Sequence, residues 1–257
     1  MRRTLAAVLI ASVAPFALSI AAAAETKSAT PAYITAAMND PARKDDAAND
    51  DSRKLASVMT FAQVKPGQKV LELIPGKGYW TRVFSHVVGA KGHVYTVWPK
   101  EMEKFATKSL ASWQELVKQP PYTNVSLLEQ PAAALSVPEP VDLVFTSQNY
   151  HDYHDAFMGP ADLGVFGKQV LAALKPGGVF IVIDHTAKAG SGLDATDTLH
   201  RIDPDVVKKE MTAAGFIFDG SSDALHNPAD PLTAKVFDAS IRGHTDQFIF
   251  RFRKPAK

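Results

Sequence analysis

The nine residues 147–155, SQNYHDYHD, contain two histidines, two aspartates and an asparagine, all of which can take part in chemistry. His151 can act as a general base, or contact a substrate, with Asp152 or Asp155 orienting its ring. The segment also fits a polar helix start in which Asn149 and Asp152 cap the backbone. A third interpretation is a divalent metal held by His151, His154 and a neighbouring acid. It ranks last, because two histidines three residues apart are a weak ligand pattern, and we assign no metal ligand.

A second segment, VLELIPGKGYWT from Val70 to Thr81, has the composition of a ligand-binding turn. An apolar strand runs into two glycines, and a helix pattern follows. Glycine lets the backbone approach a ligand, and the N-terminus of a helix favours an anionic group. Ile74-Pro75 stands where such loops usually carry their first glycine, which narrows the space for a ligand.

Strand and helix patterns alternate from residue 69 onward, which predicts an α/β fold with a doubly wound, mostly parallel sheet. The predicted helices are 52–64, 79–89, 101–119, 161–175 and 203–215. The predicted strands are 69–74, 93–98, 124–129, 141–147, 179–185, 216–222 and 246–254. The last two strands have no long helix between them, so we expect them to pair antiparallel. In such a sheet the ligand binds beyond the carboxyl ends of the strands.

Further polar residues fall at or near this edge. His185 follows Asp184 at the end of a predicted strand, and His200 precedes a helix start. Both can line a pocket with His151, although simple packing is slightly favoured for His200. Arg201 is expected to pair with local acids. Arg242 and His244 can reach the site only if the segment 224–244 folds over it as a lid; otherwise Arg242 pairs with Asp238 or Asp246.

Three segments in this order, VLELIPGKGYWT, LKPGGVFIVIDH and RIDPDVVKKEMTAAGF, resemble the class I S-adenosylmethionine-dependent methyltransferases. More narrowly, SQNYHD at 147–152 and RGHTDQF at 242–248 are similar to segments of exported, methyltransferase-like bacterial proteins. The resemblance covers residues 50 to 254. It implies a Rossmann-like, seven-stranded sheet with an antiparallel last strand, and S-adenosylmethionine as the cofactor.

The resemblance also implies which residues bind the cofactor. The loop after the first strand would contact its methionyl part, and positions at the ends of later strands would contact the rest. The residues at these positions are Glu72, Pro75, Gly76, Lys77, Gly78, Trp98, Glu129, Gln130 and Ser147. Two positions depart from the family pattern. Trp98 stands where an acid usually holds the ribose hydroxyls, and a tryptophan nitrogen only donates hydrogen bonds. No acid follows Glu129 and Gln130, where one often binds the adenine amine.

The N-terminus predicts export. Residues 1–24 carry Arg2-Arg3, an apolar run and a terminal Ala22-Ala23-Ala24, which is the pattern of a cleavable secretory signal. We expect cleavage after Ala24, a flexible arm over 25–50, a single domain over 51–257, and a periplasmic or secreted location without a stable membrane anchor. The chain has no cysteine, so no disulfide or lipoprotein anchor can form.

Charge argues against a polyanionic partner. The net charge of +1 comes from 28 basic and 27 acidic residues, and the basic ones are scattered. Loss of Arg2 and Arg3 would leave a mature net charge of −1. We therefore expect no nucleic-acid partner, and a small-molecule substrate. Oligomeric state does not follow from the sequence.

The leading hypothesis is thus an exported methyltransferase that acts on a small molecule. His151 would take a proton from the acceptor, and Asn149, Tyr150 and Asp152 would position it. The first alternative is a non-catalytic protein that keeps the fold and binds another ligand through Trp98. The second is a metal-dependent enzyme that uses His151 and His154.

Overall fold

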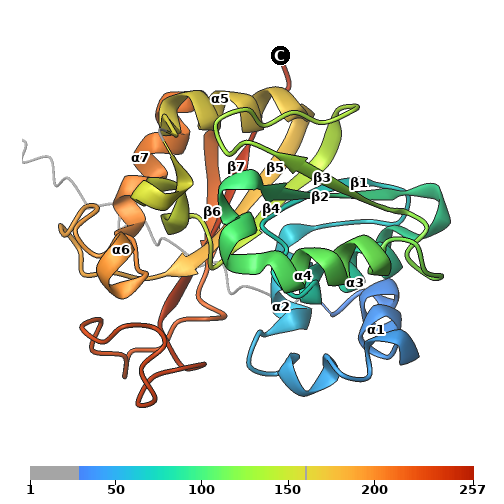
Figure 1. Cartoon of the computed structure of the whole chain (residues 1–257), viewed down its shortest axis with the longest axis horizontal. Coiled ribbons are helices and arrows are strands. Elements are labelled where there is room, and N and C mark those ends of the chain that lie inside the picture. Colours follow the sequence, from blue (N-terminus) through green and yellow to red (C-terminus); the bar gives the residue numbers. More distant parts are fainter. Residues whose placement is uncertain (1–28, 160) are drawn as a thin grey trace, which may run out of the picture.

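The computed structural model describes residues 29–159 and 161–257, and its centre is one sheet (Figure 1). The strand order is β3-β2-β1-β4-β5-β7-β6. The strands are β1 (Lys69–Leu73), β2 (His93–Pro99), β3 (Val125–Gln130), β4 (Val141–Ser147), β5 (Leu174–His185), β6 (Ile217–Ser222) and β7 (Gln247–Arg253). The predicted seven-stranded, doubly wound sheet is confirmed.

The first five strands are parallel, and β7 runs antiparallel to both β5 and β6. The expected antiparallel pairing of the last two strands is therefore confirmed. The central strands are apolar because helices cover both of their faces. Ile181, Val182 and Ile183 of β5, for example, have no exposed surface. The order of the strands reverses between β1 and β4, and ligands of such sheets bind at this point.

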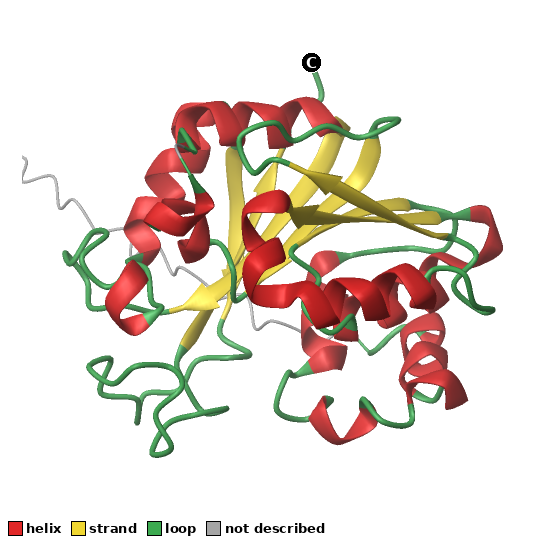
Figure 2. Cartoon of the chain, viewed as in Figure 1, coloured by secondary structure: helices red, strands yellow, loops and turns green. Residues whose placement is uncertain are grey.

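Helices cover the sheet in two layers (Figures 1 and 2). Side chains of α1 to α4 form one core with one face of the sheet, and side chains of α5 and α7 form the other. The helices are α1 (Ala32–Met38), α2 (Leu55–Ala62), α3 (Tyr79–Val88), α4 (Glu103–Leu116), α5 (Leu163–Ala173), α6 (Thr196–Leu199) and α7 (Pro204–Ala214).

The prediction of a flexible arm over 25–50 is wrong for residues 31–50. This stretch forms α1 and two short 3-10 helices, Pro41–Arg43 and Ala47–Asn49. Ile34 and Ala37 of α1 are buried against the first core. The buried Arg43 guanidinium donates to the Ala37 carbonyl and to the Asp50 carboxylate, which links the end of α1 to the segment that follows it.

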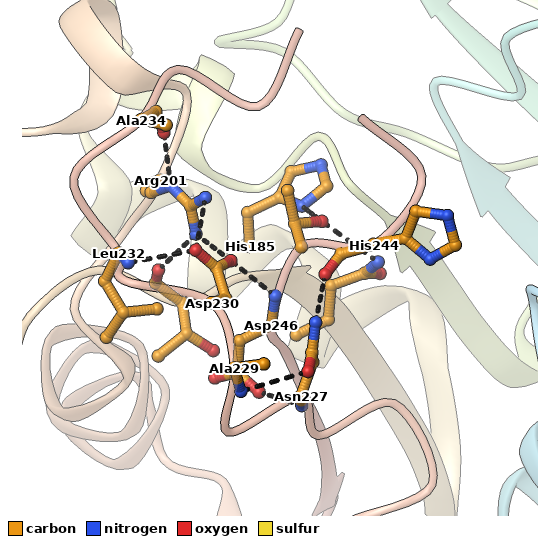
Figure 3. A network of polar contacts seen from close by, with 12 residues as sticks. His185, Arg201, Asn227, Ala229, Asp230, Leu232, Ala234, His244 and Asp246 are labelled. Atoms are coloured by element: carbon orange, nitrogen blue, oxygen red, sulfur yellow. Dashed lines mark hydrogen bonds and ion pairs between the residues drawn. The ribbon is translucent and has the colours of Figure 1, made fainter. Parts of the chain in front are cut away.

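The 223–246 loop connects β6 to β7 and carries no helix or strand (Figure 2). Figure 3 shows what fixes it: the buried Arg201 guanidinium contacts both oxygens of the buried Asp230 carboxylate, at 2.9 and 3.1 Å. Arg201 also donates to the Ala234 carbonyl, and Asp230 accepts from the Leu232 and Asp246 backbone nitrogens. Arg201 therefore pairs with an acid, as expected, but with one 29 residues away rather than one nearby in the sequence, and the loop is anchored at several points.

No helix among the described residues has the length and apolarity needed to cross a membrane. The predicted signal peptide, 1–24, lies outside the described residues.

Candidate active site

The turn after β1 keeps the backbone shape of a glycine-rich loop although its first position is isoleucine. Ile74 has φ +51°, and Gly76 and Gly78 have φ +55° and +78°. A left-handed conformation is a true outlier for a β-branched residue, and such strain persists where surrounding contacts fix it. Two side chains do so here: Asn149 Nδ2 donates to the Ile74 carbonyl, and Trp113 Nε1 donates to the Gly76 carbonyl at 2.7 Å.

A cavity of about 450 Å³ opens at the carboxyl ends of β1, β4 and β5. Most of the predicted cofactor and catalytic residues line it: Glu72, Pro75, Gly76, Lys77, Ser147, Asn149, His151 and Asp152. His185, His200 and Ile74 line it as well. Its volume falls within the usual range for small-molecule sites.

A second cavity of about 320 Å³ adjoins the first and shares part of its wall, including Arg53, Trp80 and Phe237. The 223–246 loop forms much of this wall, and Arg242 lines it. The loop therefore folds over the site. We expected Arg242 to reach the site only in that case. The predicted pairing of Arg242 with Asp238 or Asp246 is not among the ion pairs of the described residues.

Glu72, at the base of the first cavity, is a buried carboxyl that accepts a hydrogen bond from the Thr81 hydroxyl. Burial raises the pKa of Glu72 to about 8, and the hydrogen bond from Thr81 and the nearby Arg82 and Arg53 oppose this only in part. The carboxyl is therefore mostly protonated at neutral pH. A cationic ligand group nearby would favour its ionised form.

His151 is held by the carboxylate at the end of the neighbouring strand. Its Nδ1 lies 2.9 Å from Asp184 Oδ1, and its backbone nitrogen donates to Asp184 Oδ2 at 2.8 Å. Burial lowers the pKa of His151, but the Asp184 carboxylate outweighs this and raises that pKa to about 9. The imidazole is therefore protonated at neutral pH, which weakens the hypothesis that His151 acts as the base in the unliganded state.

His200 brings a third titratable side chain to this place from the end of α6. Its Nδ1 lies 3.3 Å from His151 Nε2. Burial, together with the positive charges of His151 and Lys235, lowers the pKa of His200, so this ring is neutral at pH 7. The neighbouring Asp152 carboxyl is perturbed as well, because burial raises its pKa to about 6.

His200 lines the cavity and contacts His151, so the slight preference for simple packing at His200 is wrong.

His185 also reaches the cavity, as the sequence allowed. Its Nδ1 lies 2.8 Å from the Thr245 hydroxyl in the 223–246 loop (Figure 3). Burial lowers the pKa of His185 to about 4, so it is neutral across the physiological range.

Besides Gly78, four predicted site residues do not line the cavity. Tyr150 is fully buried against the opposite core, and its hydroxyl donates to Glu210 at 2.6 Å. Trp98 is buried in the first core, and its Nε1 has no partner among the described residues. Glu129 is exposed beside Gln114, and Gln130 bonds to Ser136. Strand side chains alternate between faces, and position in the sequence alone did not settle which face each of these takes.

Two further predictions are corrected by the same geometry. Gly78 packs closely against the Trp113 ring and does not line the cavity, because a Cβ at this position would lie 2.6 Å from that ring. His154 points away from His151: its Nε2 lies 3.3 Å from Glu210, and its ring packs beside Tyr150. The metal hypothesis based on His151 and His154 as partners is therefore wrong.

Comparison with known proteins agrees with this architecture. The family model of protein-L-isoaspartate(D-aspartate) O-methyltransferase matches residues 30–129. The protein-L-isoaspartate O-methyltransferase of Methanosarcina mazei is 30% identical over 131 residues, which are 50% of this chain and 45% of that relative. The match thus spans less than half of the relative's length.

Solved structures match over most of the chain. A SAM-dependent methyltransferase from Aquifex aeolicus superposes with a TM-score of 0.54 at 18% identity, covering 86% of this chain and 96% of the other. The glycopeptide N-methyltransferase MtfA, solved with S-adenosylmethionine, gives a TM-score of 0.54 at 17% identity, covering 78% and 86%. The chain therefore has the fold of class I S-adenosylmethionine-dependent methyltransferases, and its first half is similar in sequence to protein-L-isoaspartate O-methyltransferases.

Proposed function

We propose that the protein binds S-adenosylmethionine in the 450 Å³ cavity and transfers its methyl group to a small molecule. The observation that carries this proposal is the cavity's position. It lies where the strand order reverses, and it joins the loop after β1 to the polar residues after β4. Methyl transfer needs chiefly in-line alignment of donor and acceptor, which such a cavity can provide.

The cofactor's methionyl group fits the loop side of the cavity. Gly76 leaves open space for a close approach, because a Cβ there would meet nothing within 4 Å. The backbone at the start of α3 favours the cofactor's carboxylate. Glu72 is placed to accept the cofactor's amino group, and this pairing would lower the pKa of its carboxyl.

The nucleoside side of the cavity lacks the usual acids. Met102 lines it after β2, whereas Trp98 and Glu129 lie elsewhere. Loss of a hydrogen-bonding acceptor costs about 1–3 kcal/mol, so we expect cofactor binding weaker by on the order of 10²-fold than with both acids present. The alternative, a non-catalytic binding protein, also rests on the absence of these acids. It proposed that the ligand contacts Trp98, but the Trp98 side chain is buried in the first core and cannot contact a ligand in the cavity.

The adjoining 320 Å³ cavity is the proposed place of the acceptor. Arg53 and Arg242 line it together with the apolar side chains of Trp80 and Phe237, and no carboxylate is among its described lining residues. This combination favours a small acceptor with an anionic group and an apolar body. The relative from Methanosarcina mazei carries the name of an enzyme that methylates proteins, so an isoaspartyl peptide is the competing acceptor.

Binding of S-adenosylhomocysteine by calorimetry tests the cofactor site. We expect one equivalent to bind, and a Gly76→Val variant to bind at least tenfold more weakly. Gly177→Val is the matched control, because Gly177 has φ +76° and equal open space but lies near the start of β5 and does not line the cavity. Absence of heat release with the unchanged chain, or equal binding by both variants, would overturn the proposal.

Transfer of a labelled methyl group separates the two acceptor classes. We expect incorporation with small carboxylated aromatic compounds and a reduction of at least tenfold in Arg242→Ala. Incorporation only into isoaspartyl peptides would replace the small-molecule acceptor by a protein.

We further propose that the protein acts outside the cytoplasm, which the signal pattern of residues 1–24 supports. N-terminal sequencing of the protein from a periplasmic extract should begin at Glu25. Recovery of the uncleaved chain from the cytoplasm alone would contradict export.

A further inference from the structure

Three side chains that the sequence did not propose as a set of metal ligands meet at the wall of the main cavity. Among the described residues, His151, Asp152 and His200 form one cluster of possible metal ligands. His151 and Asp152 come from the 3-10 helix His151–His154 after β4, and His200 ends α6 after β5. Because α6 packs against that 3-10 helix, two distant parts of the chain supply the cluster.

The spacing of the three polar atoms is that of ligands around one ion. His151 Nε2 lies 3.3 Å from His200 Nδ1 and 3.4 Å from Asp152 Oδ1, and the third edge is 4.0 Å. Bonds of about 2.1 Å to a tetrahedral zinc ion place neighbouring ligand atoms about 3.4 Å apart. An octahedral ion would bring them closer, to about 3.0 Å. Two edges fit the tetrahedral value, and the third, at 4.0 Å, must shorten by about 0.6 Å to reach it.

The second layer of contacts also fits metal binding. Asp184 accepts from His151 Nδ1, and Nε2 faces the cluster, where a metal ion would replace the proton that this nitrogen carries in the unliganded chain. A carboxylate on the far nitrogen is the usual partner of a metal-binding histidine, because it fixes the ring and increases its basicity.

We propose that His151, Asp152 and His200 bind one divalent transition-metal ion with tetrahedral preference, zinc being the best match. All three residues line the cavity, so the fourth coordination position faces the space where a ligand binds. An oxygen atom of the acceptor can take that position if the acceptor reaches from the adjoining cavity into this one. This last role rests on the proposed methyl transfer, whereas metal binding itself does not.

Cobalt titration tests the site directly, because tetrahedral cobalt(II) absorbs visible light far more strongly than octahedral cobalt(II). The full chain is produced without a histidine tag, stripped with chelator and titrated with Co²⁺, and then with Zn²⁺ in competition. We expect one equivalent of Co²⁺ with intense visible bands, which one equivalent of Zn²⁺ abolishes.

Variants locate the ion. His200→Ala and Asp152→Asn should weaken Co²⁺ binding by at least 100-fold, and Asp184→Asn by 10- to 100-fold through His151. His154→Asn is the matched control, since it removes the neighbouring histidine that points toward Glu210, and its binding should be unchanged. The thermal unfolding midpoint of His200→Ala, whose side chain is 21% exposed, confirms that it still folds.

No stoichiometric Co²⁺ binding, or binding that His200→Ala leaves intact, would overturn the proposal. The titration contains no S-adenosyl compound, and the calorimetry above can be repeated with the stripped protein. Failure of the metal site and failure of the cofactor site are therefore separate results.

Discussion

Replacement of Glu72 by glutamine should stabilise the protein, and increasingly so as the pH rises. The glutamine keeps the shape and a carbonyl oxygen that accepts from the Thr81 hydroxyl, but it cannot ionise. The pKa of Glu72 is about 8 in the folded chain against an ordinary value of 4.5. Between these two values the folded state binds the proton and the unfolded state does not. Stability of the unchanged chain from this residue therefore falls as the pH rises from 4.5 to 8.

The magnitude follows from the same shift. Each pH unit inside this window changes the free energy of unfolding by about 1.4 kcal/mol, so the advantage of Glu72→Gln should grow by about 2–3 kcal/mol between pH 5.5 and 7.5. Above pH 8 the difference should level off, because Glu72 is then ionised in both states.

Urea unfolding of both proteins at a series of pH values measures this difference. Other titrating groups contribute equally to the two chains and cancel in the subtraction. Glu129→Gln, at an exposed carboxylate that accepts a hydrogen bond from the Gln114 amide, should show no comparable pH-dependent gain. A flat difference between the unchanged chain and Glu72→Gln would show that Glu72 is already ionised at pH 5.5 and would refute the argument.

Three further substitutions give separate checks. Arg201→Met should lower the free energy of unfolding by about 3–5 kcal/mol in urea titrations, because it leaves the buried Asp230 carboxylate without its cation; a loss below 1 kcal/mol would contradict this. Gly78→Ala should cost about 1–3 kcal/mol more than Gly177→Ala, because only its Cβ collides with the Trp113 ring, at 2.6 Å; equal losses would rule out the collision. Ile74→Gly should tighten binding of S-adenosylhomocysteine by several-fold in calorimetry, because it clears the cavity and relieves a strained backbone; weaker binding would show that the isoleucine contacts the ligand favourably.

The fold was predictable because its signals are local. The apolar run of β5 and the glycine loop after β1 fix where strands end and helices begin, and an alternating order of such elements allows few topologies. Because ligands of such sheets bind beyond the carboxyl ends of the strands, the sequence also predicted that the loop 74–78 and the residues after β4 share one site. The structure brings Gly76, Asn149 and His151 together as expected.

The features of the site that the sequence did not predict depend on which way a side chain points and on contacts between residues far apart in the sequence. Trp98 and Tyr150 lie near strand ends as predicted, yet each side chain points into a core, and a one-residue change of phase decides that outcome. His200 meets His151 across 49 positions of sequence through the packing of α6. No local pattern encodes that contact. The folded segment 31–50 did have a sequence signal, because Ile34 and Ala37 are three residues apart and lie on one face of α1.

The most direct test of the central claim is a crystal structure of the chain with S-adenosylhomocysteine at saturating concentration. We predict that the methionyl group lies against residues 75–77 and that its amino group points toward Glu72. The sulfur should face the part of the cavity between Asn149 and His200. Ligand bound elsewhere, or an unchanged cavity at a concentration that saturates a related methyltransferase, would contradict it.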